Sequence, residues 1–305
     1  MKTRNKLNIW LWVLACIPCL LTGCDHNVHD GEGDGSLSIS LDWADEADEG
    51  TEVKDVKTWI MNAEDGTLVE QSQHGSAQEM ASERYDLPEG HYRILTTTNL
   101  VPPFTLSEQT RAVTDINNLV IGLSDPSASP EHAYYGVTDI VIDNENVHYI
   151  TKSDMRRVLA ELTINIKGAP QQTKITGKVL NVATGLVALQ QNEDGTFGTP
   201  TRTKEECDIP AGITILDNMF ATTKPILLMP TCDGVQYTNL FIVLETPDGN
   251  ITRYDLKAPV MKPSGKYIVN LEYNEMKPEM HLSSVKIDDW TEGWVYYGEI
   301  FDPEN

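Results

Sequence analysis

Cys24 is the residue of this chain whose surroundings best suit covalent chemistry. It directly follows Leu21-Thr22-Gly23. This junction resembles a lipobox, in which small residues precede a cysteine whose thiol receives diacylglycerol before the preceding segment is cleaved off. We therefore expect cleavage between Gly23 and Cys24, and Cys24 as the lipidated first residue of the mature chain. This covalent lipid is the one non-protein group that we expect, since no pattern indicates a cofactor.

The segment in front of Cys24 has the two parts of an export signal. Its first residues carry three cations and no acidic residue, and an uncharged run over residues 9–21 follows, interrupted by Pro18. Such a run suits a signal peptide but is too short for a bilayer core of about 30 Å, which needs roughly 20 apolar residues. We predict a lipoprotein signal over residues 1–23 and no membrane span in the mature chain. The alternative is an ordinary secretory peptide with an incidental cysteine.

Two further cysteines, Cys207 and Cys232, remain in the mature chain. Outside the cytoplasm such a pair can oxidise to a disulfide. The bond would close a loop of about 25 residues, which stabilises a fold by roughly 3 kcal/mol in the chain-entropy account. Two independent reduced thiols are the equally open alternative.

Patterns typical of enzymes and metal sites are missing from the sequence. It contains no Gly-x-Ser-x-Gly, no His-Glu-x-x-His and no phosphate-binding glycine loop. Carboxylate pairs such as Asp288-Asp289 arise by chance among 46 acidic residues. The acidic repeat from Asp30 to Gly35 resembles the start of a calcium loop, but Leu41 stands where the bidentate glutamate is needed. We predict no catalytic and no metal-binding residue.

The charge of the chain restricts its partners. Removing the three cations of the signal peptide takes the formal net charge from −23 to −26. Nucleic acid is therefore excluded as a partner, because its phosphates need lysine and arginine. An anionic membrane surface would also repel the chain, so attachment to the membrane depends on the lipid.

The pattern of apolar residues predicts strands throughout the mature chain. Residues 24–35 are polar and glycine-rich, as in a flexible tether. From there on, apolar and polar residues alternate and turn residues recur, with no long helical period. The predicted strands cover residues 37–43, 53–62, 67–69, 91–98, 119–123, 134–142, 147–151, 157–166, 174–181, 186–189, 213–220, 226–229, 238–245, 251–256, 266–273, 280–286 and 294–301.

This spacing of short strands favours an all-β fold of two β-sandwiches. The small residues Gly168-Ala169-Pro170 interrupt the pattern and mark the predicted boundary. We expect an N-terminal sandwich over residues 36–168 and a C-terminal sandwich over residues 169–305.

Several short motifs, in this order, resemble the fimbrillin superfamily of Bacteroides-type fimbriae, and within it the branch of lipoprotein anchors or minor subunits. The resemblance covers most of the mature chain and rests on residues 87–92, 133–136, 157–162, 263–267 and 287–293, together with the lipobox. It implies two transthyretin-like Greek-key sandwiches. It also implies assembly with fimbrial stalk subunits, in which a strand donated by one subunit completes the sandwich of the next.

The arginines distinguish an anchor from a stalk subunit. In stalk subunits of this superfamily a protease cuts after an arginine and removes the first strand. Here no arginine occurs between Arg4 and Arg84, and residues 44–52 contain none. We therefore favour an uncleaved anchor or accessory subunit, held by its lipid in the outer membrane at the cell surface.

The C-terminal segment is the candidate donor strand. Trp294, Tyr296, Gly298 and Ile300 alternate with their neighbours near the end of the chain, where fraying is usual. The alternative is that this segment is the last core strand of the second sandwich. Two other functions stay open: a tip or stand-alone adhesin for a host or bacterial surface ligand, and a glycan-binding surface lipoprotein.

Overall fold

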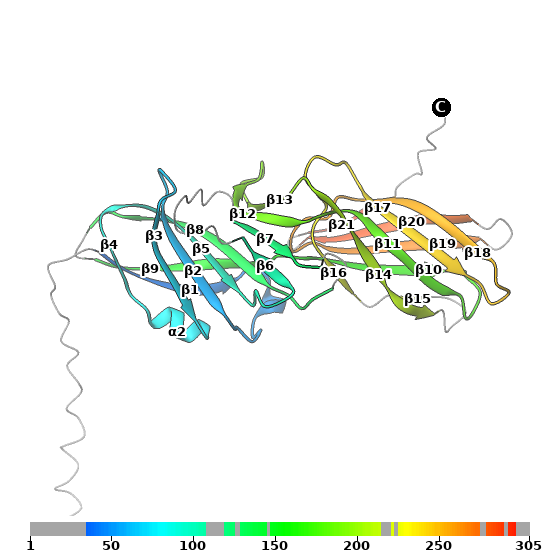
Figure 1. Ribbon diagram of the computed structural model, residues 1–305, viewed down its shortest axis with the longest axis horizontal. Helices are drawn as coiled ribbons and strands as arrows, with labels where there is room; N and C mark the ends of the chain where they lie inside the picture. Colours follow the sequence, from blue (N-terminus) through cyan, green and yellow to red (C-terminus); the bar gives the residue numbers. More distant parts are fainter. Residues whose placement is uncertain are drawn as a thin grey trace, which may run out of the picture. The chain divides into compact units, whose positions relative to one another are not determined.

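The computed structural model describes residues 35–107, 119–125, 129–144, 147–214, 221–222, 225–274, 279–289 and 292–296. Within these ranges the chain forms twenty-one strands and two short helices (Figure 1). The predicted all-β class is confirmed. All the described residues belong to one compact unit that begins at Asp34. The signal peptide, Gly23 and Cys24 lie outside the described residues.

The first sheet has seven strands and folds over on itself. Its two ends face each other, because Leu37 and Ile39 from one end share a buried cluster with Ile60 and Ile94 from the other. The strands are, in spatial order, β3 (Leu68–His74), β2 (Val56–Asn62), β5 (Gly90–Thr98), β8 (Tyr134–Ile142), β9 (His148–Arg157), β1 (Gly35–Trp43) and β4 (Tyr85–Leu87).

The short helix α2 (Ala77–Ser82) covers one side of this cluster with the buried Met80. Its start is capped in both directions: the N-cap Ser76 accepts a hydrogen bond from the Glu79 amide at 3.2 Å, and the Glu79 side chain accepts one at 2.7 Å from the amide of Gly75, the residue before the N-cap. The sequence left this segment open between a loop and a short helix. The reciprocal cap shows why six residues suffice for a helix here.

A second sheet joins strands from the two halves of the sequence. It consists of β13 (Phe197–Pro200), β12 (Gly185–Gln191), β7 (Val120–Leu123) and β6 (Phe104–Leu106). Gly122 pairs with Gly185, and an added Cβ on Gly122 would lie 2.9 Å from a backbone oxygen, so the two strands need glycine where they meet. Strand pairing therefore crosses the boundary that we predicted at residue 168.

Two further sheets enclose the largest core. One contains β15 (Ala221–Thr222), β10 (Ala160–Lys167), β19 (Lys266–Asn274), β20 (Glu279–Asp289) and β21 (Glu292–Tyr296), with β16 (Ile226–Leu228) also paired to β10. The other contains β14 (Lys204–Thr214), β11 (Lys174–Ala183), β17 (Thr238–Glu245) and β18 (Ile251–Ala258). Alternate residues from both sheets, such as Leu162 on β10 and Leu240 on β17, are fully buried in one cluster.

These sheets correct one predicted strand placement and extend another. We expected β10 to complete the N-terminal sandwich, but it pairs in parallel with β19, because its buried face belongs to the large core. Of the strand that we expected at residues 213–220, residues 213–214 belong to β14, which begins at Lys204, and residues 215–220 lie outside the described residues. We did not predict the start of β14 because it is rich in charged residues. Glu206 and Asp208 are exposed while Cys207 and Ile209 are buried, as in a strand with one face toward solvent.

Candidate functional site

The first strand is held on both sides within its sheet. β1 pairs in parallel with β9 from Ser36–His148 to Trp43–Met155, and its start pairs with β4. Leu37 and Ile39 are 0% and 1% exposed, so the inward face of β1 is part of the core. Removing this strand would open an apolar groove and leave the facing edges of β9 and β4 unpaired.

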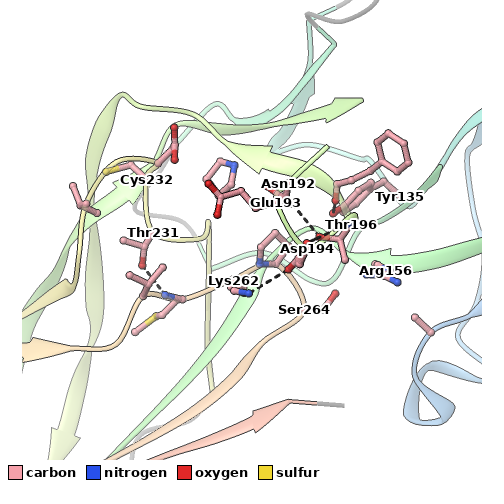
Figure 2. A pocket seen from close by; sticks show the side chains of 18 of the residues that line it. Tyr135, Arg156, Asn192, Glu193, Asp194, Thr196, Thr231, Cys232, Lys262 and Ser264 are labelled. Carbon is pink, nitrogen blue, oxygen red and sulfur yellow. Dashed lines mark hydrogen bonds and ion pairs between the residues drawn. The ribbon is translucent and has the colours of Figure 1, made fainter. Parts of the chain in front are cut away.

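A large cavity lies where β1 ends, and we call it the Trp43 cavity. Its volume is about 890 Å³. Its walls come from the end of β1, from β8 and β9, from the turn between β12 and β13, and from the segments that follow β16 and β18. Figure 2 shows Asp194 and Lys262, which come from two of these segments, joined by an ion pair at 3.3 Å.

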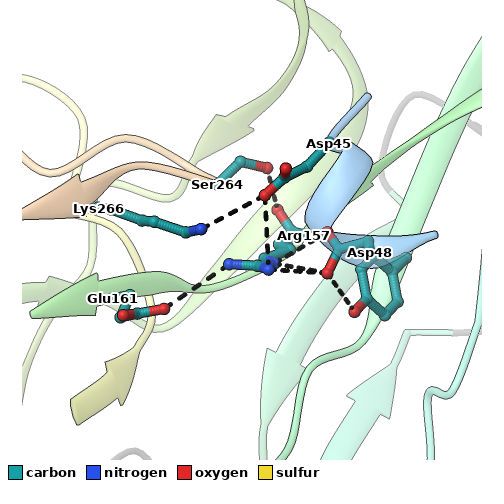
Figure 3. Close-up of polar contacts among 7 residues, drawn as sticks. Asp45, Asp48, Arg157, Glu161, Ser264 and Lys266 are labelled. Carbon is teal, nitrogen blue, oxygen red and sulfur yellow. Dashed lines mark hydrogen bonds and ion pairs between the residues drawn. The ribbon is translucent and has the colours of Figure 1, made fainter. Parts of the chain in front are cut away.

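The segment that follows β1, which we call the connector (residues 44–55), is fixed by a buried ion pair. Asp48 lies at the end of the short helix η2 (Glu46–Asp48) and is 4% exposed. The Arg157 guanidinium, at the end of β9, donates to both carboxylate oxygens of Asp48 at distances between 2.7 and 3.1 Å. Tyr134 on β8 donates a further hydrogen bond to Asp48 at 3.0 Å (Figure 3).

More charges surround this pair, and we call the whole group the Arg157 cluster (Asp45, Asp48, Tyr134, Arg157, Glu161 and Lys266). Asp45 of the connector lies 3.6 Å from Arg157 and 3.4 Å from Lys266 on β19. Glu161 on β10 lies 3.7 Å from the other side of the guanidinium. Figure 3 shows these side chains converging from the connector, β9, β10 and β19. The connector is thereby tied to strands of two different sheets.

Burial and charge shift the pKa values within and beside the cluster. Burial by itself lowers the pKa of Arg157, but the hydrogen bonds and charge of Asp48 outweigh it, so the pKa is raised. Burial raises the pKa of Tyr134, which stays a neutral donor to Asp48. His132, beside Tyr134, has its pKa lowered to about 4 by burial and by the nearby charge of Arg157. Buried cations near a histidine favour its neutral form.

The C-terminal candidate strand is partly described. Trp294 and Tyr296 lie on β21, which pairs with β20 opposite Ile287 and Val285. Gly298 and Ile300 lie outside the described residues. In the order of the sheet, β21 is the last strand. Residues 292–296 are thus paired with β20 of their own chain, at the end of this sheet among the described strands.

The two described cysteines are buried thiols, and the structure does not join them in a disulfide. Cys207 lies on β14 opposite Val179 and belongs to the large core. Cys232 follows β16, its amide donates to Asn181, and it lines the Trp43 cavity. The two side chains therefore have different surroundings.

Metal-binding groups and membrane-crossing helices were searched for in the part of the chain that the structure describes. No group of three or more histidine, cysteine or acidic side chains is placed to hold a metal ion there. No helix among those residues has the length and apolar character needed to cross a bilayer.

Sequence reasoning did not find the Arg157 cluster. The only signal was the charged Arg157 directly before the apolar run that starts β10, together with two aspartates in a connector without arginine. Arg84, the first arginine after Arg4, is exposed between α2 and β4. A cut after Arg84 would separate three strands, β1, β2 and β3, from the rest of the chain. Arg84 is therefore unsuited to the removal of the first strand alone.

Known proteins share this architecture. The fold is similar to a candidate polysaccharide-binding protein of Bacteroides thetaiotaomicron, with 12% identity, a TM-score of 0.58, and coverage of 87% of this chain and 99% of that one. It is also similar to the fimbrial anchor protein Mfa2 of Porphyromonas gingivalis, with 14% identity, a TM-score of 0.55, and coverage of 87% and 98%. A candidate adhesin of Bacteroides thetaiotaomicron has 12% identity, a TM-score of 0.56 and coverage of 84% and 96%.

These structural likenesses establish the fold, and the sequence itself gives the family. No curated protein matches the sequence. The family model of fimbrillin-A associated anchor proteins Mfa1 and Mfa2 matches residues 23–295, which is most of the chain. This match indicates a non-enzymatic fimbrial or adhesin protein of the cell envelope. The chain belongs to the family of fimbrillin-A associated anchor proteins.

Proposed function

We propose that this chain is the lipid-anchored base subunit of a fimbria. In this proposal Cys24 carries the lipid that holds the chain in the outer membrane at the cell surface. The C-terminal segment around Trp294 to Ile300 pairs with a stalk subunit as a donated strand. The observation that carries the proposal is the retained first strand: β1 is paired on both sides, and its connector is tied down by the Asp48–Arg157 pair.

The retained strand matters because a stalk subunit must lose it. A subunit that accepts a donated strand needs an open groove with unpaired backbone groups. In this chain β1 fills that groove, and the connector offers no arginine for cleavage. Such a subunit can donate a strand to a neighbour but accept none in the place of β1. A chain with these properties ends a polymer, as a base subunit does.

The donor end fits the same proposal. β21 is the last strand in the order of its sheet and pairs through five residues, from Val285–Tyr296 to Asp289–Glu292. A short edge strand near a chain end is held by few hydrogen bonds, so it is among the segments that open most easily. Main-chain pairing with a neighbouring subunit would replace those bonds and add the alternating side chains of residues 294–300.

The test is a pull-down of the intact lipoprotein from outer membranes. Two truncations serve as comparisons: one ends at Tyr296 and keeps β21, and the other ends at Glu292 and removes it. We expect heat-resistant ladders of a stalk subunit with the full chain and none with the shorter truncation. A Cys24→Ser chain should release the same assembly from the membrane. A full chain that comes down alone and monomeric would contradict base anchoring.

A second candidate function is that of a tip or stand-alone adhesin, or of a glycan-binding surface lipoprotein. The similar fold of a candidate polysaccharide-binding protein and the large Trp43 cavity favour it. The copurification experiment separates base anchoring from a stand-alone adhesin or a glycan-binding lipoprotein, because neither of these carries a stalk subunit.

A further inference from the structure

We propose that the Trp43 cavity binds a neutral carbohydrate. The proposal names the ligand class and the site for the second candidate function, on which it rests, and it is independent of donor-strand pairing. A cavity of about 890 Å³ lies within the range of small-molecule sites. Its lining combines half-buried aromatic and proline side chains with charged and amide groups, and the question is which ligand chemistry this lining would favour.

The charges of the lining neutralise one another in pairs. Arg156 lies 3.2 Å from Asp154, and Lys262 lies 3.3 Å from Asp194. A third carboxylate, Asp233, is paired at 2.9 Å with Arg202, which stands just outside the lining. An anionic ligand would have to compete with these carboxylates for the cations. A cationic ligand would meet carboxylates that already have a cationic partner, with the exception of Glu193.

A purely apolar ligand is disfavoured as well. It would strip water from six charged side chains of the lining without replacing the lost hydrogen bonds, and such unpaired burial is costly. A ligand rich in hydroxyl groups avoids this cost, because each hydroxyl both donates and accepts. The ion pairs then serve as ready acceptors and donors at fixed positions.

Aromatic rings supply the second half of a carbohydrate site. Trp43 is half-buried and is held by an edge-to-face contact with Tyr134, with ring centroids 4.9 Å apart. Phe197 is half-buried too, and the Arg93 guanidinium covers one face of its ring at 4.8 Å. Rings fixed in this way present flat apolar surface at low entropic cost, which suits the apolar faces of sugar rings.

The turn between β12 and β13 gives the site a firm frame. The Asn192 side chain donates to Thr196 at 3.1 Å and to the Gly198 carbonyl at 3.3 Å. Buried Tyr135 donates to the Phe197 carbonyl at 2.7 Å. Figure 2 shows Asn192, Asp194 and Thr196 grouped on this turn opposite Lys262. Within this turn, the exposed Glu193 is the carboxylate best placed to accept a ligand hydroxyl without a role in the fold.

The experiment measures saturation transfer by NMR from the whole mature chain to four neutral probes: mannotriose, chitotriose, maltotriose and xylotriose. Sialyllactose and pentalysine serve as charged probes. We expect transfer to at least one neutral probe and to neither charged one. Transfer to none of the neutral probes, or stronger transfer to a charged probe, would overturn the proposal.

Variants locate the binding. Glu193→Ala and Trp43→Ala should each weaken binding of the neutral probe at least about tenfold, which is the loss expected for a hydrogen bond to a charged group or for a stacking surface. Glu89→Ala, an exposed glutamate outside the cavity lining, is the matched control and should bind unchanged. Trp43 also packs on Tyr134, so Trp43→Ala could destabilise the fold. If Trp43→Ala lowers the melting temperature, the test rests on Glu193→Ala alone. Unchanged binding in Glu193→Ala would contradict a site in this cavity.

Discussion

The guanidinium of Arg157 donates to both carboxylate oxygens of Asp48, although 109 residues separate them in the chain. Both side chains are buried, at 8% and 6% exposed. The pair joins the end of β9 to the connector that follows β1, which is the segment where a cut would detach β1 from the rest of the chain. Mutations of Asp48 and Arg157 therefore test what holds β1 and its connector in the fold.

Breaking the pair should destabilise the protein strongly. Asp48→Ala leaves the buried Arg157 charge with only the more distant carboxylates of Asp45 and Glu161, at 3.6 and 3.7 Å, and loss of one partner of a buried pair costs about 3–5 kcal/mol. The measurement is the free energy of unfolding in urea. The matched control is Asp42→Ala, which removes the exposed pair with Lys152 and should cost less than about 1 kcal/mol. A similar small cost for both variants would show that the buried pair does not fix the connector.

Neutralising both partners should restore part of the loss. The double variant Asp48→Leu with Arg157→Met removes both charges together, and such replacements of buried pairs are often neutral. We expect the double variant to be more stable than Asp48→Ala by at least about 2 kcal/mol in the same urea titration. A double variant that is no more stable than Asp48→Ala would contradict direct coupling between the two side chains.

The connector should resist cleavage even when it carries an arginine. Glu49 is exposed and next to Asp48. We expect Glu49→Arg to be cut slowly at position 49 by an arginine-specific protease, and the same change with Asp48→Asn to be cut at least about tenfold faster, because proteolysis needs a locally opened segment. Mass spectrometry of the fragments gives both rates, and the exposed Arg84 serves as an internal reference site. Equal rates at position 49 would indicate a connector that the ion pair does not hold.

The sequence predicted strands better than it predicted their partners. The alternation at Leu37 and Ile39 identifies β1, because the side-chain period of a strand is visible locally. Its parallel pairing with β9 joins residues more than 110 positions apart and depends on packing that no local pattern contains. For the same reason the pairing of β7 with β12 and the Arg157–Asp48 contact were not predicted. The predicted Cys24 lipidation and the donor role of Trp294, Tyr296, Gly298 and Ile300 stay predictions.

The buried thiol of Cys207 should be unreactive in the folded protein. Burial, reinforced by the charges of Asp208 and Asp125, raises its pKa to about 12, so the reactive thiolate is scarce at neutral pH. We expect iodoacetamide to modify Cys207 at pH 8 in urea but not in the native state. Mass spectrometry of the mature chain also tests the disulfide. A bond between Cys207 and Cys232 in protein isolated from the envelope would contradict the two separate thiols of the structure.

Acid should destabilise the fold through His132. Its pKa of about 4 in the folded protein lies below the 6.5 of an unfolded histidine, so the unfolded chain binds the proton more readily. The contribution to stability is therefore fully present above pH 6.5 and is lost as the pH falls toward 4. The groups that act on His132 are Arg157 and Lys266, which oppose a positive charge, and Asp48, which favours it.

The variant His132→Gln removes this titration and leaves the carboxylates unchanged. Between about pH 7 and pH 4.5 the wild type should lose about 2 kcal/mol more of its unfolding free energy than the variant does. Urea titrations at the two pH values give the difference directly. The glutamine side chain does not reproduce the packing of the imidazole, so the two proteins differ in stability at every pH. The comparison therefore uses only the change in unfolding free energy between the two pH values. Equal losses in the two proteins would mean that His132 protonates without penalty, and that the space beside the Arg157 cluster opens to water in acid.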